Sequence, residues 1–345
     1  MKLDWRGALG IALSAALLWW ALREVSPAEV WRVLRASNAL LFAASTVAAT
    51  LIFPLRARRW QSILEPVAGR LPFASLWHAT AIGMMANNVL PARIGEVARA
   101  YALTREQPTV KFGTSIASLA VDRLFDAIVL LGLMFLAVAD PAFPANATVA
   151  GRSLDQIATV GMVSIAVLLV GLYGVVLLQD RAAQWAEAIV RPLSARLAHT
   201  VGDLARHFVH GLAVLRAPSR FLGVLFWAVA HWLMHALALW LAFRAVGITA
   251  PFTAALFLQG LLGFAVALPS SPGFFGVFEV AAQYGLAIYG VPASLAISWA
   301  IGYHLLSFIP ITLLGAMYFA RLGLHVRDFS GRAREEPELV PGAQP

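Results

Sequence analysis

Three charged residues in the stretch NNVLPARIGEVARAYAL (87–103) have types and a spacing suited to binding a phosphate. Arg93, Glu96 and Arg99 recur every three residues, so on a helix they would share one face. Guanidinium groups contact phosphate oxygens in a bidentate way, and a nearby carboxylate can balance their charge. The alternative is that these side chains lie at a membrane interface and extend into water.

A second polar group lies on the apolar segment that follows. Asp122 and Asp126 are four residues apart, with Arg123 adjacent, and Ser115 and Ser118 continue the same polar stripe. A charge at membrane depth costs about 2.5–3.5 kcal/mol on insertion scales, so such residues usually face a cavity and pair. The stripe therefore either lines a substrate cavity or links two helices through an ion pair.

A single acid stands out in the second half of the chain. Glu279 is the only acidic residue between Asp203 and Asp328, and it follows a Ser-Ser-Pro-Gly break. We interpret Glu279 as a candidate substrate contact or proton carrier. His304, on a later apolar segment, is a further candidate for lining a cavity.

The composition is that of a membrane protein. Of 345 residues, 60% are apolar and 13% are charged, whereas soluble domains are nearer half apolar and a quarter charged. The net charge is +8, but the Arg residues flank apolar runs, which favours membrane loops over a nucleic-acid partner. The absence of Cys excludes disulfides and thiol catalysis.

Signatures of catalysis and of bound cofactors are missing. There is no Walker A, HExxH or GxSxG motif, so we expect no enzymatic activity and no cofactor. His231 and His235 are four residues apart, a spacing that can bind a metal. No acid or Cys accompanies them, and Trp232 lies between them, which favours packing over a metal site.

Apolar runs long enough to cross a bilayer, about 20 residues, recur along the chain. They fall near 7–22, 38–55, 113–138, 157–178, 221–243 and 294–320. Two shorter stretches, 74–90 and 253–268, each lead through a break into a short helix, 94–104 and 273–290. The break residues are Asn87, Asn88, Pro91 and Gly95 in the first and Pro269, Ser270, Ser271, Pro272, Gly273 and Gly276 in the second. The sequence predicts an all-α polytopic protein with about six full spans and two broken-helix hairpins, each either re-entrant or crossing twice.

Positive charge orients these segments, because cytoplasmic loops are rich in Lys and Arg. A predicted loop with Arg56, Arg58, Arg59 and Arg70, the segment 179–220 and the C-terminal tail are all rich in Arg, and 139–156 has one. The pattern predicts cytoplasmic N- and C-termini in a bacterial inner membrane. The predicted external loop 23–37 is the exception, with three Arg.

We expect one transmembrane domain, 1–324, followed by a disordered tail, 325–345. Within that domain, the segment 180–216 has apolar residues at three- and four-residue spacing with Arg opposite. That pattern is typical of an amphipathic helix on the inner leaflet, or of a helix hairpin packed on the bundle.

Two parts of the chain repeat each other, about 38–138 and 221–320. EVARAYAL (96–103) is echoed by EVAAQYGL (279–286), and in both copies a Leu-Pro pair precedes the echo. The charge pattern gives the copies opposite orientation. An inverted repeat with interrupted helices is typical of secondary transporters, whose site lies where the broken helices meet.

These motifs resemble a known family over roughly residues 7–320. NNVLPARIGEVARAYAL, AVDRLFD, ALPSSPGFFGVFEVA and GYHLLSFIPITLLGAMYF are similar to the lysylphosphatidylglycerol synthetase transmembrane region, a flippase-like family. By position, Arg93, Glu96, Arg99, Arg123, Asp126, Pro272, Gly273, Gly276 and Glu279 match its motifs. Asp122 stands where relatives often have Glu. The resemblance implies the translocating region without the aminoacyl-transferase domain of the full synthetases.

We therefore predict a flippase or scramblase that moves an anionic or aminoacylated phospholipid, or a related polar lipid, between leaflets. The three Arg would hold the headgroup phosphate, and the four acids would balance them or contact a cationic headgroup. The partners would be membrane lipids and a possible lipid-modifying enzyme. The alternatives are a carrier of a small soluble solute, a non-catalytic partner of a lipid-modifying or glycosyl-transfer enzyme, and a membrane-embedded transferase.

Overall fold

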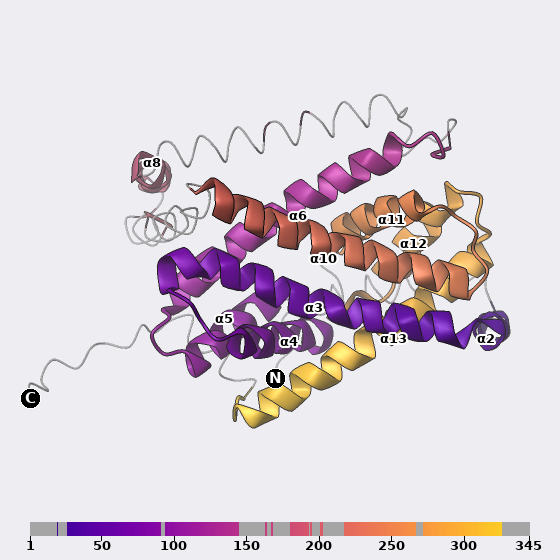
Figure 1. Ribbon diagram of the computed structural model, residues 1–345, viewed down its shortest axis with the longest axis horizontal. Coiled ribbons are helices and arrows are strands. Elements are labelled where there is room, and N and C mark those ends of the chain that lie inside the picture. Colours follow the sequence, from indigo (N-terminus) through magenta and orange to yellow (C-terminus); the bar gives the residue numbers. More distant parts are fainter. Residues whose placement is uncertain are drawn as a thin grey trace, which may run out of the picture.

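The computed structural model describes residues 26–90, 94–144, 180–192, 201–202, 217–266 and 272–325, with a few single positions besides (Figure 1). Every regular element in this part of the chain is a helix, as predicted. The predicted spans 7–22 and 157–178 and the tail 326–345 lie outside it, except for single residues. Of the predicted amphipathic segment, the structure describes mainly α8 (Asp180–Val190).

Within the described residues, three helices are long and apolar enough to cross a membrane: α3 (Ala39–Ala68), α10 (Pro218–Ala245) and α13 (Ala293–Arg321). A fourth predicted span is the helix α6 (Phe112–Val138), whose 27 residues include three charged ones near its middle. Transmembrane helices are thus present in the described part, and the count of six spans stays a prediction.

Helix α3 is longer than predicted. Its N-terminus is capped by Asn38, whose side-chain oxygen accepts hydrogen bonds from two backbone N–H groups, and it continues through Pro54 to Ala68. Arg56, Arg58 and Arg59 therefore lie on the helix, and the predicted loop at this point is wrong. The physical reason is that a buried apolar face, including Trp60, continues beyond the arginines.

The predicted external loop 23–37 is also wrong in part, because it contains the helix α2 (Pro27–Ala36). The hydroxyl of Ser26 accepts a hydrogen bond from the Glu29 N–H at 3.2 Å, and Pro27 opens the helix. Val30 of α2 packs with Ile297 of α13. Arg32 and Arg35, which seemed misplaced in a loop, thus belong to a short helix that packs on the bundle, and Arg23 lies outside the described residues.

The two predicted broken-helix hairpins are present as helix pairs. The first consists of α4 (Phe73–Val89) and α5 (Gly95–Glu106). The second consists of α11 (Phe252–Ala265), the short 3₁₀ helix η3 (Pro272–Phe274) and α12 (Val277–Ala287). Pro91, Pro269, Ser270 and Ser271, which were predicted at the breaks, lie outside the described residues, as does Arg93, which was predicted to contact the phosphate.

Helices α3 and α10 pack along each other and run together through the molecule, with α4–α5 towards one end and α11–α12 towards the other (Figure 1). Helix α4 packs on α13, and α11 packs on α6. Each hairpin therefore contacts a long helix from the other half of the chain. In addition, η3 contacts α4, so the two hairpins touch.

Besides the small contact of Val30 with Ile297, two large apolar clusters form the described core. One joins α3, α10, α11 and α13 and includes Val121 and Phe125 of α6. The other joins α4, α5 and the second half of α3 and includes Leu119 of α6. The charged residues of α6 therefore lie where the two clusters adjoin, surrounded by apolar packing.

Candidate functional site

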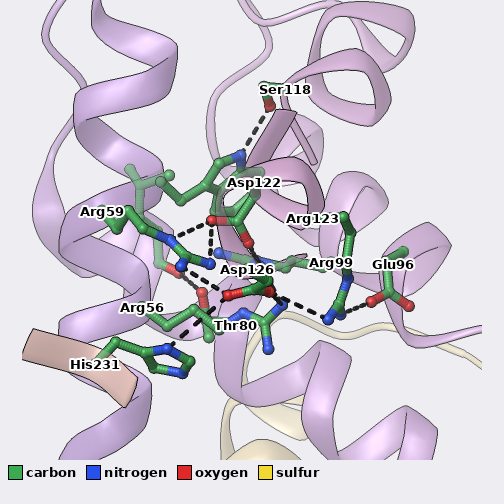
Figure 2. Close-up of polar contacts among 12 residues, drawn as sticks. Arg56, Arg59, Thr80, Glu96, Arg99, Ser118, Asp122, Arg123, Asp126 and His231 are labelled. Carbon is green, nitrogen blue, oxygen red and sulfur yellow. Dashed lines mark hydrogen bonds and ion pairs between the residues drawn. The ribbon is translucent and has the colours of Figure 1, made fainter. Parts of the chain in front are cut away.

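Two carboxylates of α6 share one guanidinium from α3. Asp122 and Asp126 are one helical turn apart, and Arg59 is fully buried between them (Figure 2). The Nε of Arg59 donates to Asp122 Oδ1 at 2.7 Å, and its Nη1 donates to Asp126 Oδ1 at 2.7 Å. This pair of charge-assisted bonds fixes α3 against α6.

Two further arginines approach the outer oxygens of the same carboxylates. Nη2 of Arg56 lies 3.4 Å from Asp122 Oδ2 and 3.3 Å from Asp126 Oδ2. Arg123 Nη1 lies 3.4 Å from Asp126 Oδ2, and its other terminal nitrogen pairs with Glu96 of α5. Among the described charged residues of this group, Arg123 and Glu96 are the most exposed, at 43% and 30% of their side chains.

Arg99 of α5 is the least satisfied cation of the group. Its Nη1 donates to Asp122 Oδ2 at 3.3 Å, and its guanidinium carbon lies 4.1 Å from the centre of the Trp60 ring. The Trp60 indole in turn donates to Ser118 Oγ at 2.8 Å. Nε and Nη2 of Arg99 are buried and have no hydrogen-bond partner among the described residues, and Arg99 is only 4% exposed.

The cluster carries more positive than negative charge. Four guanidinium groups face three carboxylates, which leaves one positive charge among the described residues. We call this set the arginine cluster; its members are Arg56, Arg59, Arg99, Arg123, Glu96, Asp122 and Asp126. A buried charge without a counter-ion is costly, so the cluster has the chemistry of an anion site.

A small cavity of about 10 Å³ adjoins the free donors. It is lined by Arg56, Arg99, Arg123, Glu96 and residues of α4 that include Gly83 and Asn87. That volume is about what one water molecule or one ligand oxygen needs. A whole phosphate group would need the Glu96–Arg123 pair to separate.

The side of the cluster formed by α10 is neutral and aromatic. Trp232 donates its indole N–H to Asp126 Oδ1 at 3.0 Å, and His231 Nδ1 lies 4.0 Å from the same oxygen. His231 packs edge-on against Trp232, as does His235. In the described residues no three His, Cys, Asp or Glu side chains gather to hold a metal.

The first hairpin is closed by backbone-to-side-chain contacts at its break. Asn87 of α4 accepts a hydrogen bond from the Gly95 N–H at 2.8 Å, and Asn88 donates to Thr312 of α13 at 2.8 Å. A Cβ at Gly83 would lie 2.7 Å from the Gly95 carbonyl oxygen and 2.9 Å from Arg99 Cβ. Small residues at both positions therefore let α5 approach α4 closely enough to place Arg99 in the cluster.

We expect Gly95→Ala to weaken the fold, because its Cβ would collide with the Gly83 carbonyl and the Asn87 side chain. Overpacking of this kind typically costs about 1–3 kcal/mol. Thermal unfolding in detergent would measure the loss. Gly132→Ala of α6 is the matched control, since its Cβ would meet nothing within 4 Å, and we expect it to be neutral or stabilising. Equal unfolding temperatures for the two variants would contradict the packing described.

Glu279 occupies a second buried polar site, at the break of the other hairpin. It is 1% exposed. Its Oε2 accepts a hydrogen bond from the Gly276 N–H at 2.6 Å, and its Oε1 lies 2.7 Å from His304 Nδ1. Gly273 and Gly276 have φ angles of 71° and 85°, the left-handed region that favours glycine. The partners of Glu279 are thus Gly276 and His304, whereas the sequence had suggested that it would balance arginines or contact a cationic headgroup.

The structure brings together five of the predicted site residues and adds partners that the sequence did not indicate. Glu96, Arg99, Asp122, Arg123 and Asp126 form one group, while Glu279 lies with His304 in another. Arg56, Arg59 and Trp60 were missed. The available signal was the i, i+3 spacing of Arg56 and Arg59 directly after an apolar run with no helix-ending residue between them and Trp60.

Comparisons with known proteins agree with this architecture. A sequence model of the family described as "Lysylphosphatidylglycerol synthase TM region" matches residues 7–315. The chain is 29% identical over 300 residues to the glycosyltransferase AglD of Haloferax volcanii, a match that covers 79% of the chain and 47% of that protein. A UPF0104 membrane protein of Methanothermobacter thermautotrophicus is 27% identical, with 92% of the chain and 93% of that protein covered. The chain therefore spans about half the length of the glycosyltransferase and nearly all of the UPF0104 protein.

Proposed function

The chain belongs to the lysylphosphatidylglycerol synthase TM region family, and from this premise we propose that it moves a lipid with an anionic headgroup between the leaflets of a bilayer. We place it in the bacterial inner membrane with cytoplasmic termini. It would act as a translocator, without catalysing a covalent reaction.

The observation that carries the proposal is the unbalanced Arg99. Two of its N–H donors are buried without a partner beside the cavity, in a cluster with one excess positive charge. Hydrogen bonds from charged groups are worth about 1.5–3 kcal/mol each, and an unmade one costs a similar amount. An anionic oxygen is the ligand that satisfies both the donors and the charge, and a phospholipid headgroup supplies it inside a bilayer.

Arg123 and Glu96 would control access to this site. Glu96 pairs with Arg123 at the exposed edge of the cavity, so it occupies the position that a ligand oxygen would take. An arriving phosphate would displace the Glu96 carboxylate from Arg123 and then meet Arg99. The Arg59 bridge would stay intact, because both of its carboxylates are buried away from that edge.

The packing of the helices supports a structural repeat, and the charge pattern of the sequence supports its inversion. Among these eight helices, exchanging α3, α4, α5 and α6 for α10, α11, α12 and α13 carries every packing pair either into another observed pair or, for α3 with α10, into itself. For example, the contact of α4 with α13 becomes the contact of α11 with α6. Inverted repeats with broken helices give alternating access when one half rocks against the other. The absence of an ATP-binding motif favours movement that is downhill or coupled to an ion.

Lipid exchange in liposomes tests this function. The purified protein is reconstituted with a headgroup-labelled phosphatidylglycerol, and an impermeant quencher reports the label that reaches the outer leaflet. We expect faster exchange than in protein-free liposomes. No acceleration with any of several phospholipid headgroups, with or without a proton gradient, would overturn the proposal and favour a carrier of a soluble anion.

One comparison favours a second candidate function. Because the match to AglD covers 79% of this chain, the region could serve as a membrane partner for glycosyl transfer to a lipid. The charged residues of the arginine cluster would then only stabilise the fold and would not bind a ligand. Normal lipid distribution together with co-purification of a glycosyl-transfer enzyme would identify this case.

A further inference from the structure

We infer that Glu279 and His304 together form a binding site for one proton, and that this proton holds the second hairpin closed. The role of this proton in transport rests on the proposed function, but the existence of the proton site does not. The site itself follows from three hydrogen bonds around the break between η3 and α12, which are independent of the arginine cluster.

The hydrogen-bond partners of His304 assign its protons. Nε2 lies 2.7 Å from the carbonyl oxygen of Gly273, and a carbonyl can only accept, so Nε2 must carry a hydrogen. Nδ1 lies 2.7 Å from Glu279 Oε1. The hydrogen in this second bond comes either from Nδ1 or from a protonated carboxyl group. In both cases the pair holds one proton more than a neutral imidazole beside an ionised carboxylate.

The surroundings favour the imidazolium form. The rings of Phe275 and Phe278 flank the imidazole, with centroids 4.4 and 4.5 Å away. Aromatic faces stabilise a cation, so they favour a charged ring. The Glu279 carboxylate supplies the compensating negative charge, and its second oxygen is held by the Gly276 N–H at 2.6 Å.

Among the described residues, other titratable groups nearby have their own partners or lack a contact with this pair. Helix α4, which packs against α13, has His78 as its only titratable residue. The His78 ring pairs with Glu106 and lies against Tyr318. On α10, Arg244 lies over the Trp240 ring. On α13 itself, the neutral Tyr303 is stacked 6.2 Å from Phe278. Glu279 and His304 therefore balance each other's charge.

Loss of the proton would release one bond of the closed hairpin. A neutral imidazole has a single N–H, which can serve Glu279 or Gly273 but not both. The carboxylate is the stronger acceptor, so the N–H would remain with Glu279 and the Gly273 carbonyl would be freed. Gly273 is also where the backbone adopts φ 71°, against Phe308. The left-handed turn would then lose its hydrogen bond from His304 of α13.

Helix α13 also connects this site to the first hairpin. Thr312 donates to the Phe308 carbonyl at 2.7 Å and accepts from Asn88 at 2.8 Å. Asn87, adjacent on α4, holds the first turn of α5, which carries Arg99. A change in the packing of Phe308 on Gly273 thus has a contiguous route to the arginine cluster, and proton release would bias the anion site.

Nitrogen NMR of the full-length protein in nanodiscs, labelled at its eight His, tests the proton site without any transport assay. The His304 signal is identified by its loss in His304→Gln. At neutral pH we expect both His304 nitrogens of the wild type to be protonated. In Glu279→Gln, the amide can donate to Nδ1 and accept from Gly276, so we expect a neutral ring protonated at Nε2 alone. A wild-type His304 that lacks the Nε2 proton, or a doubly protonated His304 that stays unchanged in Glu279→Gln, would overturn the inference.

Lipid exchange then separates this inference from the proposed function. We expect wild-type exchange to depend on pH and Glu279→Gln to exchange at a rate independent of pH. If the NMR result holds and no lipid moves, the proton site stands and the lipid function fails. If lipid moves with the same pH dependence in both proteins, the lipid function stands and the coupling role of the proton fails.

Discussion

Replacing Arg59 with Gln should cost about 3–5 kcal/mol of stability, the usual loss when one partner of a buried ion pair is removed. Arg59 is fully buried and joins Asp122 and Asp126 to α3 with two bonds of 2.7 Å. The shorter amide of Gln cannot bridge both carboxylates. We expect a large fall in unfolding temperature in detergent, or failure to accumulate in the membrane.

Arg70→Gln is the control for that experiment. Arg70 is exposed just after the end of α3, and surface substitutions usually change stability by less than about 0.5 kcal/mol. If Arg59→Gln unfolds at the same temperature as Arg70→Gln, the bridge is not a main contact between α3 and α6. The account of the cluster would then need a different structural basis.

Replacing Arg99 with Gln should have the opposite effect to Arg59→Gln: lipid exchange should fall while stability is kept. The substitution removes the excess positive charge and two unpartnered donors, which favours the fold. It also removes the contact with Trp60, which opposes that gain. We expect the free energy of unfolding to stay within about 1 kcal/mol of the wild type. Lipid exchange should fall by about 10-fold or more, the value of one charge-assisted hydrogen bond.

Arg105→Gln on the same helix is the matched control, because Arg105 is exposed in the last turn of α5. It should leave both exchange and unfolding unchanged. A marked loss of stability in Arg99→Gln would instead show that the charge of Arg99 stabilises the fold and is already compensated within the protein. The anion site would then have no free donor to explain it.

The long helices could be predicted closely from the sequence, because their boundaries depend on local patterns. The span predicted at 294–320 is α13 (Ala293–Arg321), and that at 221–243 is α10 (Pro218–Ala245). Long apolar runs ended by Pro, Gly or Arg carry this information. The helix breaks between α4 and α5 and between α11 and α12 were likewise marked by Gly and Pro.

The ion pairs could not be predicted, because their partners lie far apart in the chain. Arg59 and Asp126 are separated by 67 positions, and Glu279 and His304 by 25. Counting Arg residues assigned Arg56 and Arg59 to a cytoplasmic loop, since the charge rule does not consider whether a buried acid is available. Two acids at membrane depth, Asp122 and Asp126, indicated that cationic side chains must lie nearby. Only tertiary packing identifies which cationic residues these are.

The central claim is that the arginine cluster recognises a lipid phosphate, and headgroup selectivity tests it most directly. Exchange by the wild type would be compared for labelled phosphatidylglycerol and for a labelled neutral glycosyl-diacylglycerol of similar size. The account predicts acceleration of the phosphate lipid by about 10-fold or more over the neutral one, since only the former satisfies Arg99. Equal acceleration of both lipids would contradict it, because exchange would then not depend on the anion.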